Sequence, residues 1–152
     1  MIKNKQNTFV NKVRIPKRKY GTCGVLIENS SKKILLQLRD KNVLFANCWG
    51  TFGGSIEKNE TPLQAILREL KEELNYNTDI TNIQYYGNFP YGGYDVHMFR
   101  IIDLSFDISN YPILEGVKAK FFSLEEVKSI KTAFHAKELV VDYYNRFHKT
   151  IK

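Results

Sequence analysis

The chain has 152 residues, of which 43% are hydrophobic and 26% are charged, and these values are ordinary for one globular domain with a full core. No apolar run approaches the roughly 20 residues of a membrane-spanning helix, and the basic N-terminus lacks the apolar segment of a secretory signal. These features favour a cytoplasmic protein that does not bind a membrane.

The net charge of +7 is concentrated at the N-terminus. The first 20 residues hold seven of the 23 basic side chains and none of the 16 acidic ones, so the rest of the chain is neutral. We divide the chain into a basic arm over residues 1–19 and a single domain over residues 20–152. A solvated tail is the favoured interpretation of the arm, and an arm that binds nucleic acid is the alternative.

Cys23 and Cys48 lack the spacing of a metal-binding pair. In a chain of this size they favour buried or free thiols in a reducing cytoplasm, and a disulfide between them stays open.

Alternating apolar residues predict strands, and apolar residues at helical spacing predict helices. In chain order, strands are predicted over residues 20–27, 32–39, 49–52, 83–89, 95–104 and 118–122. Helices are predicted over residues 62–74, 124–130 and 133–147, and the first begins with a capping box of Thr61 and Gln64. Turns are expected at residues 28–31, 53–54 and 90–93, and a loop over residues 40–48. This order predicts an α+β fold, a mixed sheet with helices packed on it.

The helix predicted over residues 62–74 presents three carboxylates on one stripe. Glu69, Glu72 and Glu73 lie within roughly 100° of one another around the helix axis, beside an apolar stripe. They repel each other, and they lie in the later turns, where the helix dipole disfavours negative charge. A solvated face is the ordinary explanation of a Glu-rich helix, but a divalent cation bound between the carboxylates explains this one better.

The segment around this helix resembles the Nudix box, G-x5-E-x7-R-E-U-x-E-E-x-G-U, in which U is a bulky aliphatic residue. Two positions depart from the box, because Asn75 replaces the last glycine and Tyr76 replaces the last aliphatic residue. Asn is the next-best residue for the left-handed conformation of a glycine that follows a helix, and neither departure removes a carboxylate. The positions that match at the family's spacing are Gly54, Glu60, Arg68, Glu69, Leu70, Glu72 and Glu73.

The resemblance extends over most of the chain and implies the family's α/β/α sandwich with a mixed sheet. It also implies a MutT-like pyrophosphohydrolase, which hydrolyses phosphorus-containing acid anhydrides with the help of Mg²⁺ or Mn²⁺. The implied substrate is a nucleoside diphosphate derivative, for example a (d)NTP or an oxidised (d)NTP. A homodimer, and nucleic acid bound through the basic arm, stay open as further partners.

The resemblance also implies roles for individual residues. The implied metal ligands are the carbonyl oxygen of Gly53 and the carboxylates of Glu69, Glu72 and Glu73. Glu69 is the first candidate for the general base. Arg68 either orients Glu69 or pairs with Glu60, and Glu60 and Gly54 are then structural. Glu115 is either a second base or ligand, as in MutT-like relatives, or an exposed loop glutamate.

Contacts to the rest of the substrate depend on residues outside the box. Arg39 is expected to face the substrate cavity. Phe89 and Tyr91 are candidates to stack on a base, although an aromatic residue in a sheet protein is more often part of the core. His97 and His135 are interpreted as structural.

Two other functions stay open. A Nudix domain that binds a nucleotide as a sensor would be favoured by a broken box or an attached DNA-binding domain. This sequence shows neither, although its basic arm keeps the hypothesis open. An isomerase of the same fold would require an added catalytic cysteine and further histidine ligands, of which Cys48 is only a weak indication.

Overall fold

The computed structural model describes residues 19–91 and 93–148. Residues 1–18, which make up nearly all of the basic arm, lie outside these ranges, so the role of the arm stays a prediction. Within the described ranges no helix is long and apolar enough to cross a membrane.

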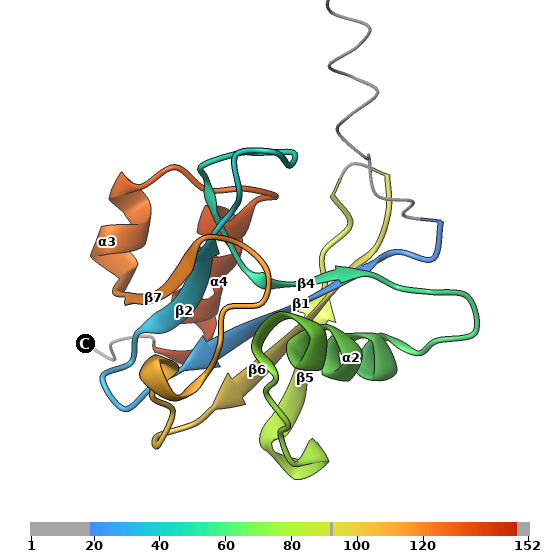
Figure 1. Ribbon diagram of the computed structural model, residues 1–152, viewed down its shortest axis with the longest axis horizontal. Helices are drawn as coiled ribbons and strands as arrows, with labels where there is room; N and C mark the ends of the chain where they lie inside the picture. The colour runs from blue at the N-terminus through green and yellow to red at the C-terminus, as the bar shows by residue number, and fades with distance from the viewer. Residues whose placement is uncertain (1–18, 92, 149–152) are drawn as a thin grey trace, which may run out of the picture.

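One mixed sheet forms the centre of the domain (Figure 1). The strands are ordered β3-β2-β1-β6-β5, with β4 also paired to β1 and β7 also paired to β2. The β1–β6 pair is parallel, and the other pairs are antiparallel. The strands are β1 (Thr22–Glu28), β2 (Ile34–Leu38), β3 (Trp49–Gly50), β4 (Phe52–Ser55), β5 (Ile83–Asn88), β6 (Val96–Ile102) and β7 (Lys118–Phe122).

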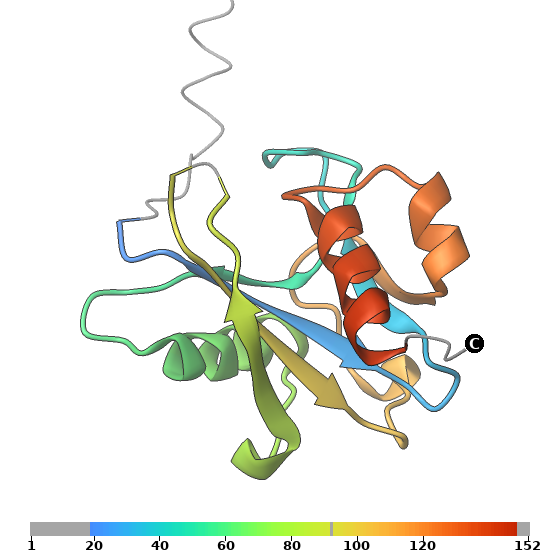
Figure 2. The same ribbon diagram turned by 180° about the vertical axis from the view of Figure 1, so that it is seen from behind.

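Helices cover both faces of this sheet. Helix α2 (Pro62–Leu74) lies on one face, and α3 (Leu124–Ser129) and α4 (Ala136–Phe147) lie on the other, as the two opposite views show (Figures 1 and 2). Side chains alternate along β1, so Val25 belongs to the core beneath α2 whereas Leu26 belongs to the core beneath α4. Two short 3-10 helices, η1 (Ile80–Asn82) and η2 (Ile108–Asn110), lie in the connections. The predicted α+β class and the α/β/α sandwich are confirmed.

Local signals define both ends of α2. The Gln64 backbone N–H donates to the Thr61 hydroxyl at 3.1 Å, and the Thr61 backbone N–H donates to the Gln64 side chain at 2.9 Å, which confirms the capping box. At the other end Asn75 adopts φ 51° and ψ 33°, the predicted left-handed conformation. The helix that carries the carboxylates therefore begins and ends at the predicted residues.

Gly53 and Gly54 do not form the predicted turn. They lie within β4, where they pair with Gly24 and Cys23 of β1, and the strand predicted over residues 49–52 is divided between β3 and β4. Two consecutive glycines usually indicate a turn. Here the two residues are extended because they pair with β1, which lies far away in the sequence.

The last helix also begins later than predicted. Phe134 and His135 have left-handed φ values of 49° and 61°, so α4 begins at Ala136 rather than at residue 133. The other predicted helices and strands agree with the structure to within two residues at each end.

Both cysteines are free thiols, in agreement with the favoured interpretation of the sequence. Burial raises the pKa of Cys23 to about 12, so its thiol is protonated and unreactive at neutral pH.

Candidate active site

The two glycines of β4 permit a close approach to two neighbouring elements. Gly53 has a φ of 143°, and a Cβ atom at this position would lie 2.1 Å from the carbonyl oxygen of Cys23. A Cβ atom on Gly54 would lie 2.4 Å from Oε1 of Glu69. Side chains at these positions would therefore push β4 away from β1 and from the carboxylates of α2.

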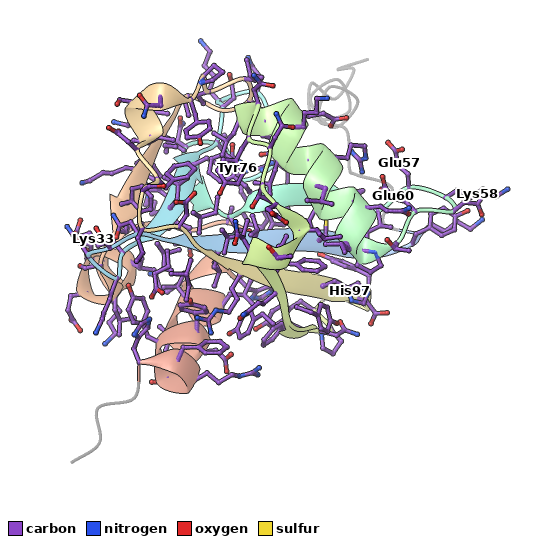
Figure 3. All side chains as sticks on the ribbon, turned by 90° about the horizontal axis from the view of Figure 1, so that it is seen from below. Lys33, Glu57, Lys58, Glu60, Tyr76 and His97 are labelled. Carbon is purple, nitrogen blue, oxygen red and sulfur yellow. The ribbon has the colours of Figure 1, made fainter. Side chains whose placement is uncertain are left out.

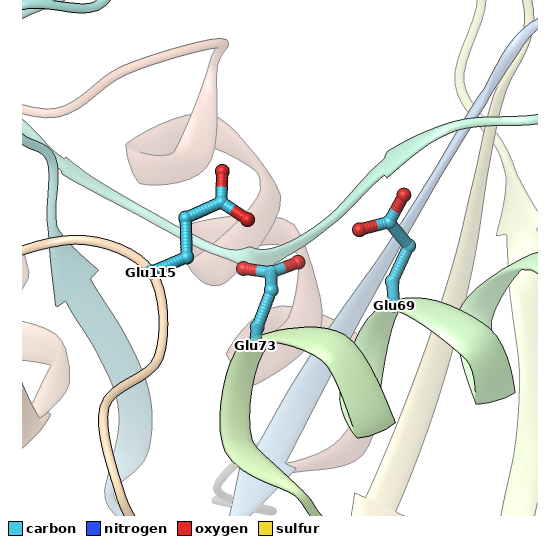
Figure 4. Close-up of side chains that lie close together, drawn as sticks. All are labelled: Glu69, Glu73 and Glu115. Atoms are coloured by element: carbon cyan, nitrogen blue, oxygen red, sulfur yellow. The ribbon is translucent and has the colours of Figure 1, made fainter.

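Three carboxylates converge beside β4. Glu69 and Glu73 extend from α2, and Glu115 extends from the loop before β7 (Figure 4). Each offers an oxygen atom within 4.8 Å of the other two. Glu73 is only 1% exposed and Glu69 is 9% exposed, whereas Glu115 is exposed at the rim. The spacing of four residues places Glu69 and Glu73 on the same side of α2.

Backbone contacts hold the loop that carries Glu115. The Leu114 N–H donates to the carbonyl oxygen of Glu73 at 2.9 Å, and the Val117 N–H donates to that of Leu38 at 2.9 Å. Gly116 has a φ of 83°, and a Cβ atom there would lie 2.9 Å from the Leu38 carbonyl oxygen. The loop is therefore attached to both α2 and β2, and these attachments bring Glu115 to the acids of α2.

Arg68 makes both of the contacts that the sequence left as alternatives. Its Nε lies 2.8 Å from Oε2 of Glu60, and its Nη1 lies 2.9 Å from Oε1 of Glu69. Its Nη2 also donates to the carbonyl oxygen of Ser55 at 3.0 Å. Hydrogen bonds from Arg68 lower the pKa of Glu60, which lies with Glu57 on the segment before α2 (Figure 3). Arg68 thus joins this segment, β4 and one of the converging carboxylates.

Glu72 is not brought into the group of three carboxylates. Its side chain is 57% exposed, and its Oε2 lies 3.3 Å from Nη1 of Arg68. Helical geometry places residue 72 about 60° from residue 69 and about 100° from residue 73, at the edge of the stripe that the three acids of α2 share. The role of Glu72 as a metal ligand stays a prediction.

Glu69 is paired with the charged Arg68, whereas the more deeply buried Glu73 carboxylate receives hydrogen bonds from neutral groups. Burial raises the pKa of Glu73 well above its ordinary value, and repulsion from Glu115 and Glu69 raises it further. Burial also raises the pKa of Glu69. The two hydrogen-bond donors to Glu73 are neutral: Gly53 N–H reaches Oε1 at 3.0 Å, and Gln37 Nε2 reaches Oε2 at 2.8 Å.

These properties test whether a metal ion fits the site. Buried anions are costly unless a positive charge compensates them. Carboxylate oxygens are the ligands that hard divalent cations such as Mg²⁺ and Mn²⁺ prefer. The donor set of Glu69, Glu73 and Glu115 therefore fits such a cation.

A pocket lies beside the carboxylates, and Arg39 is one of the residues that line it. Nε of Arg39 donates to the Leu44 carbonyl oxygen at 2.8 Å, and its guanidinium carbon lies 4.8 Å from the ring centre of Phe134. Burial lowers the pKa of Arg39, but a guanidinium keeps its charge in proteins. The residues that line this pocket include Arg39, Gly53, Gly54, Tyr94, Glu115 and Phe134.

Phe89 and Tyr91 do not belong to the lining of this pocket. They stack on each other with ring centres 6.4 Å apart, and Tyr91 stacks on His135 at 4.2 Å. Both pack against the core beneath α4. The structure therefore places these two candidates in packing contacts, while Tyr94 and Phe134 line the pocket.

Sequence reasoning missed Gln37 and Phe134. Gln37 carried a signal, because it is a polar residue within the apolar strand sequence ILLQL. Phe134 carried none, because its position in the pocket depends on the left-handed backbone before α4.

Comparison with known sequences identifies the family. The NUDIX domain model matches residues 18–143, which is most of the chain. The chain therefore belongs to the Nudix hydrolase family, and the resemblance seen in the sequence is confirmed.

Two curated relatives share parts of the sequence. The m7GpppN-mRNA hydrolase NUDT17 of Xenopus laevis is 46% identical over 50 residues, which are 32% of this chain and 17% of that protein. An uncharacterized Nudix hydrolase of Listeria innocua serovar 6a, lin0387, is 29% identical over 114 residues, which are 72% of this chain and 66% of that protein. The chain thus spans less than two thirds of the length of each relative.

A solved structure supports the fold. The NUDIX domain of Shewanella oneidensis NrtR, in a complex with ADP ribose, superposes with a TM-score of 0.67 at 20% identity. The superposition covers 82% of this chain and 86% of that one.

Proposed function

We propose that this protein is a metal-dependent pyrophosphohydrolase that cleaves the diphosphate linkage of a nucleoside diphosphate derivative. The observation that carries the proposal is the convergence of three carboxylates, from Glu69, Glu73 and Glu115, beside a pocket that contains Arg39. These carboxylates would hold Mg²⁺ or Mn²⁺, together with the carbonyl oxygen of Gly53 and, as the sequence predicts, Glu72. The cation would neutralise the diphosphate and acidify the attacking water.

Glu69 is our candidate for the general base. Arg68 holds Oε1 of Glu69 by a hydrogen bond at 2.9 Å, which leaves Oε2 to face the cation and the attacking water. In the metal-free protein, burial raises the pKa of Glu69. Glu115, which lies on an exposed loop, is the second candidate for this role.

Arg39 and Phe134 are our candidates for binding the rest of the substrate. A guanidinium group binds phosphate oxygens through parallel hydrogen bonds, and an aromatic ring stacks on a nucleobase. The 4.8 Å contact between the two side chains supports a joint role, because it holds both in the wall of the same pocket. We therefore assign base stacking to Phe134 rather than to Phe89 or Tyr91.

A second candidate function is binding of a nucleotide without hydrolysis. The likeness to the NrtR domain, which was solved with ADP ribose, is the observation that favours it. The three converging carboxylates favour the hydrolase, because binding alone does not require a buried group of mutually repelling acids. The free cysteines support a cytoplasmic location for either function.

The two functions are separated by one experiment. The protein is incubated with ADP-ribose, diadenosine tetraphosphate, a capped dinucleotide and (d)NTPs, including oxidised ones, with Mg²⁺ or with Mn²⁺. Chromatography measures the products, and calorimetry measures the binding of each compound. We expect metal-dependent release of a nucleoside phosphate from at least one compound. Tight binding with no turnover of any compound would contradict the hydrolase and support the second function.

A further inference from the structure

Gln37 is a buried polar residue in an otherwise apolar strand. It lies near the end of β2 and is only 4% exposed. A buried amide group destabilises a fold unless it makes hydrogen bonds. The contacts of this amide group therefore indicate its role.

The amide nitrogen of Gln37 contacts a carboxylate of the candidate active site. Nε2 donates to Oε2 of Glu73 at 2.8 Å, while the backbone N–H of Gly53 donates to Oε1 of the same carboxylate at 3.0 Å. Oε2 of Glu73 thus accepts a hydrogen bond from a residue of β2, and Oε1 accepts one from a residue of β4. Two donors on two oxygens fix the plane of a carboxylate and the direction of its remaining lone pairs.

The amide oxygen of Gln37 faces the loop that carries Glu115. A Cβ atom on Gly116 would lie 2.9 Å from this oxygen, so the absence of a side chain at Gly116 lets the loop pack against Gln37. The reverse orientation of the amide would turn its oxygen toward the carboxylate of Glu73, which is unfavourable while that carboxylate is charged. Gln37 therefore lies between the two segments that supply Glu73 and Glu115.

We propose that Gln37 is a positioning residue for metal binding, which holds the Glu73 carboxylate in the orientation that binds the cation together with Glu69 and Glu115. This inference rests on the proposed function, because it requires these carboxylates to form the cation site. Gln37 acts through Glu73 rather than on the substrate. Loss of such an outer-shell partner typically weakens metal affinity roughly 10–100-fold.

The variant Gln37→Met tests the proposal, because methionine has a similar size but no N–H donor. Electron paramagnetic resonance of free Mn²⁺ measures binding to the substrate-free protein. We expect the Kd for Mn²⁺ to rise roughly 10–100-fold, and kcat to recover at saturating Mn²⁺. The matched control is Gln84→Met, the same change at an exposed position of β5, which should keep wild-type affinity. Wild-type affinity in Gln37→Met would overturn the proposal.

A double-mutant cycle shows whether Gln37 acts through Glu73. Once Glu73→Gln has removed the charged carboxylate, adding Gln37→Met should weaken Mn²⁺ binding no further. Losses of affinity that add in the double variant would show that Gln37 acts elsewhere, and would overturn the proposal.

A measurement on the wild-type protein keeps the proposal testable if Gln37→Met does not fold. The side-chain amide signal of Gln37 in a nitrogen–proton correlation spectrum should shift in step with Mg²⁺ binding, whereas that of Gln84 should not. A Gln37 signal that stays unchanged while Mg²⁺ binds would overturn the proposal.

The same measurements distinguish this proposal from the proposed function. A wild-type protein that binds no Mn²⁺, or that binds it equally well after Glu73→Gln, would refute the metal site itself. Loss of binding in Glu73→Gln with wild-type binding in Gln37→Met would refute only the role of Gln37.

Discussion

The backbone N–H of Leu114 donates a hydrogen bond to the carbonyl oxygen of Glu73 at 2.9 Å, and this bond joins the Glu115 loop to the last turn of α2. Two segments far apart in the sequence are thereby combined into one group of carboxylates. The position of Glu115 depends on how the backbone of its loop packs, and Gly116 decides how closely the loop approaches β2.

Gly116→Ala should therefore be more damaging than the same change at Gly93. Both glycines have a φ of 83°, so alanine incurs a similar backbone strain of roughly 1–2 kcal/mol at either position. Only at Gly116 would the new Cβ also meet a backbone oxygen, that of Leu38 at 2.9 Å, whereas nothing lies within 4 Å at Gly93. We expect Gly116→Ala to lose at least about 1 kcal/mol more stability in urea unfolding and to bind Mn²⁺ more weakly. Equal stability of the two variants would show that the loop is not held tightly against β2.

Glu73→Gln should abolish most metal-dependent hydrolysis. The change keeps the shape of the side chain and removes an anionic ligand, so we expect a larger loss than the roughly 10–100-fold effect of an outer-shell change. Glu125→Gln is the matched control, because the Glu125 side chain is 82% exposed on α3 and outside the group of three. Turnover at limiting Mg²⁺ is the measurement. Wild-type turnover in Glu73→Gln would refute its role as a ligand, and an equal loss in Glu125→Gln would show that the loss does not come from the metal site.

The metal-free protein should become less stable as the pH rises above 4.5, the ordinary pKa of a glutamate. Burial and repulsion from Glu115 raise the pKa of Glu73 in the folded state, so the folded protein binds more protons than the unfolded one between 4.5 and the raised value. The contribution of Glu73 to the free energy of unfolding is fully present below pH 4.5, and it is lost as the pH rises through the raised pKa of Glu73.

Thermal unfolding of the metal-free protein across this pH range measures the effect. The difference between wild type and Glu73→Gln isolates Glu73 from the other carboxyl groups, and we expect the variant to be the more stable protein above the raised pKa. With added Mg²⁺, the wild-type protein should instead be more stable than Glu73→Gln. A difference that does not change with pH would show that Glu73 is ionised in the folded protein throughout.

Asn75 should tolerate glycine but not valine. Its φ of 51° is left-handed, which glycine adopts freely and a β-branched residue does not. We expect Asn75→Gly to be neutral or slightly stabilising and Asn75→Val to cost about 1 kcal/mol or more, measured by denaturant unfolding. If the two variants are equally stable, the end of α2 does not constrain this residue.

Removal of residues 1–12 should leave the turnover of small nucleotides unchanged if the N-terminal arm is a solvated tail. The deletion removes Lys3, Lys5 and Lys12, which lowers the net charge from +7 to +4. If the arm instead binds nucleic acid, long polyanions should bind more weakly, with a shallower dependence on salt. Loss of activity on mononucleotides would contradict both interpretations and would make the arm part of the fold or of a dimer interface.

Features set by nearby residues were the ones that the sequence predicted well. The capping box of Thr61 and Gln64 and the left-handed Asn75 involve only residues within or next to α2, so its boundaries followed from local rules. The extended conformation of Gly53 did not, because it depends on pairing with β1.

The candidate site divides in the same way. Glu69 and Glu73 are four residues apart, so helical geometry alone predicts that they lie on the same side of α2. The contact of Gln37 with Glu73 joins β2 to α2, and it appears only when the chain is folded. The pocket is the least predictable part, because the left-handed backbone at Phe134 brings that residue into its wall while Phe89 packs against the core beneath α4.

The parallel pairing of β1 with β6 has a consequence for the order of events on the ribosome. Strand β1 can pair fully with β6 only after all of β6 has been synthesised, and Glu115 is synthesised later still. A nascent chain that ends before β6 already contains Glu69 and Glu73, but it leaves one edge of β1 unpaired and lacks the third carboxylate. The edge of β1 that pairs with β6 is therefore exposed in the nascent chain before the group of three carboxylates can form.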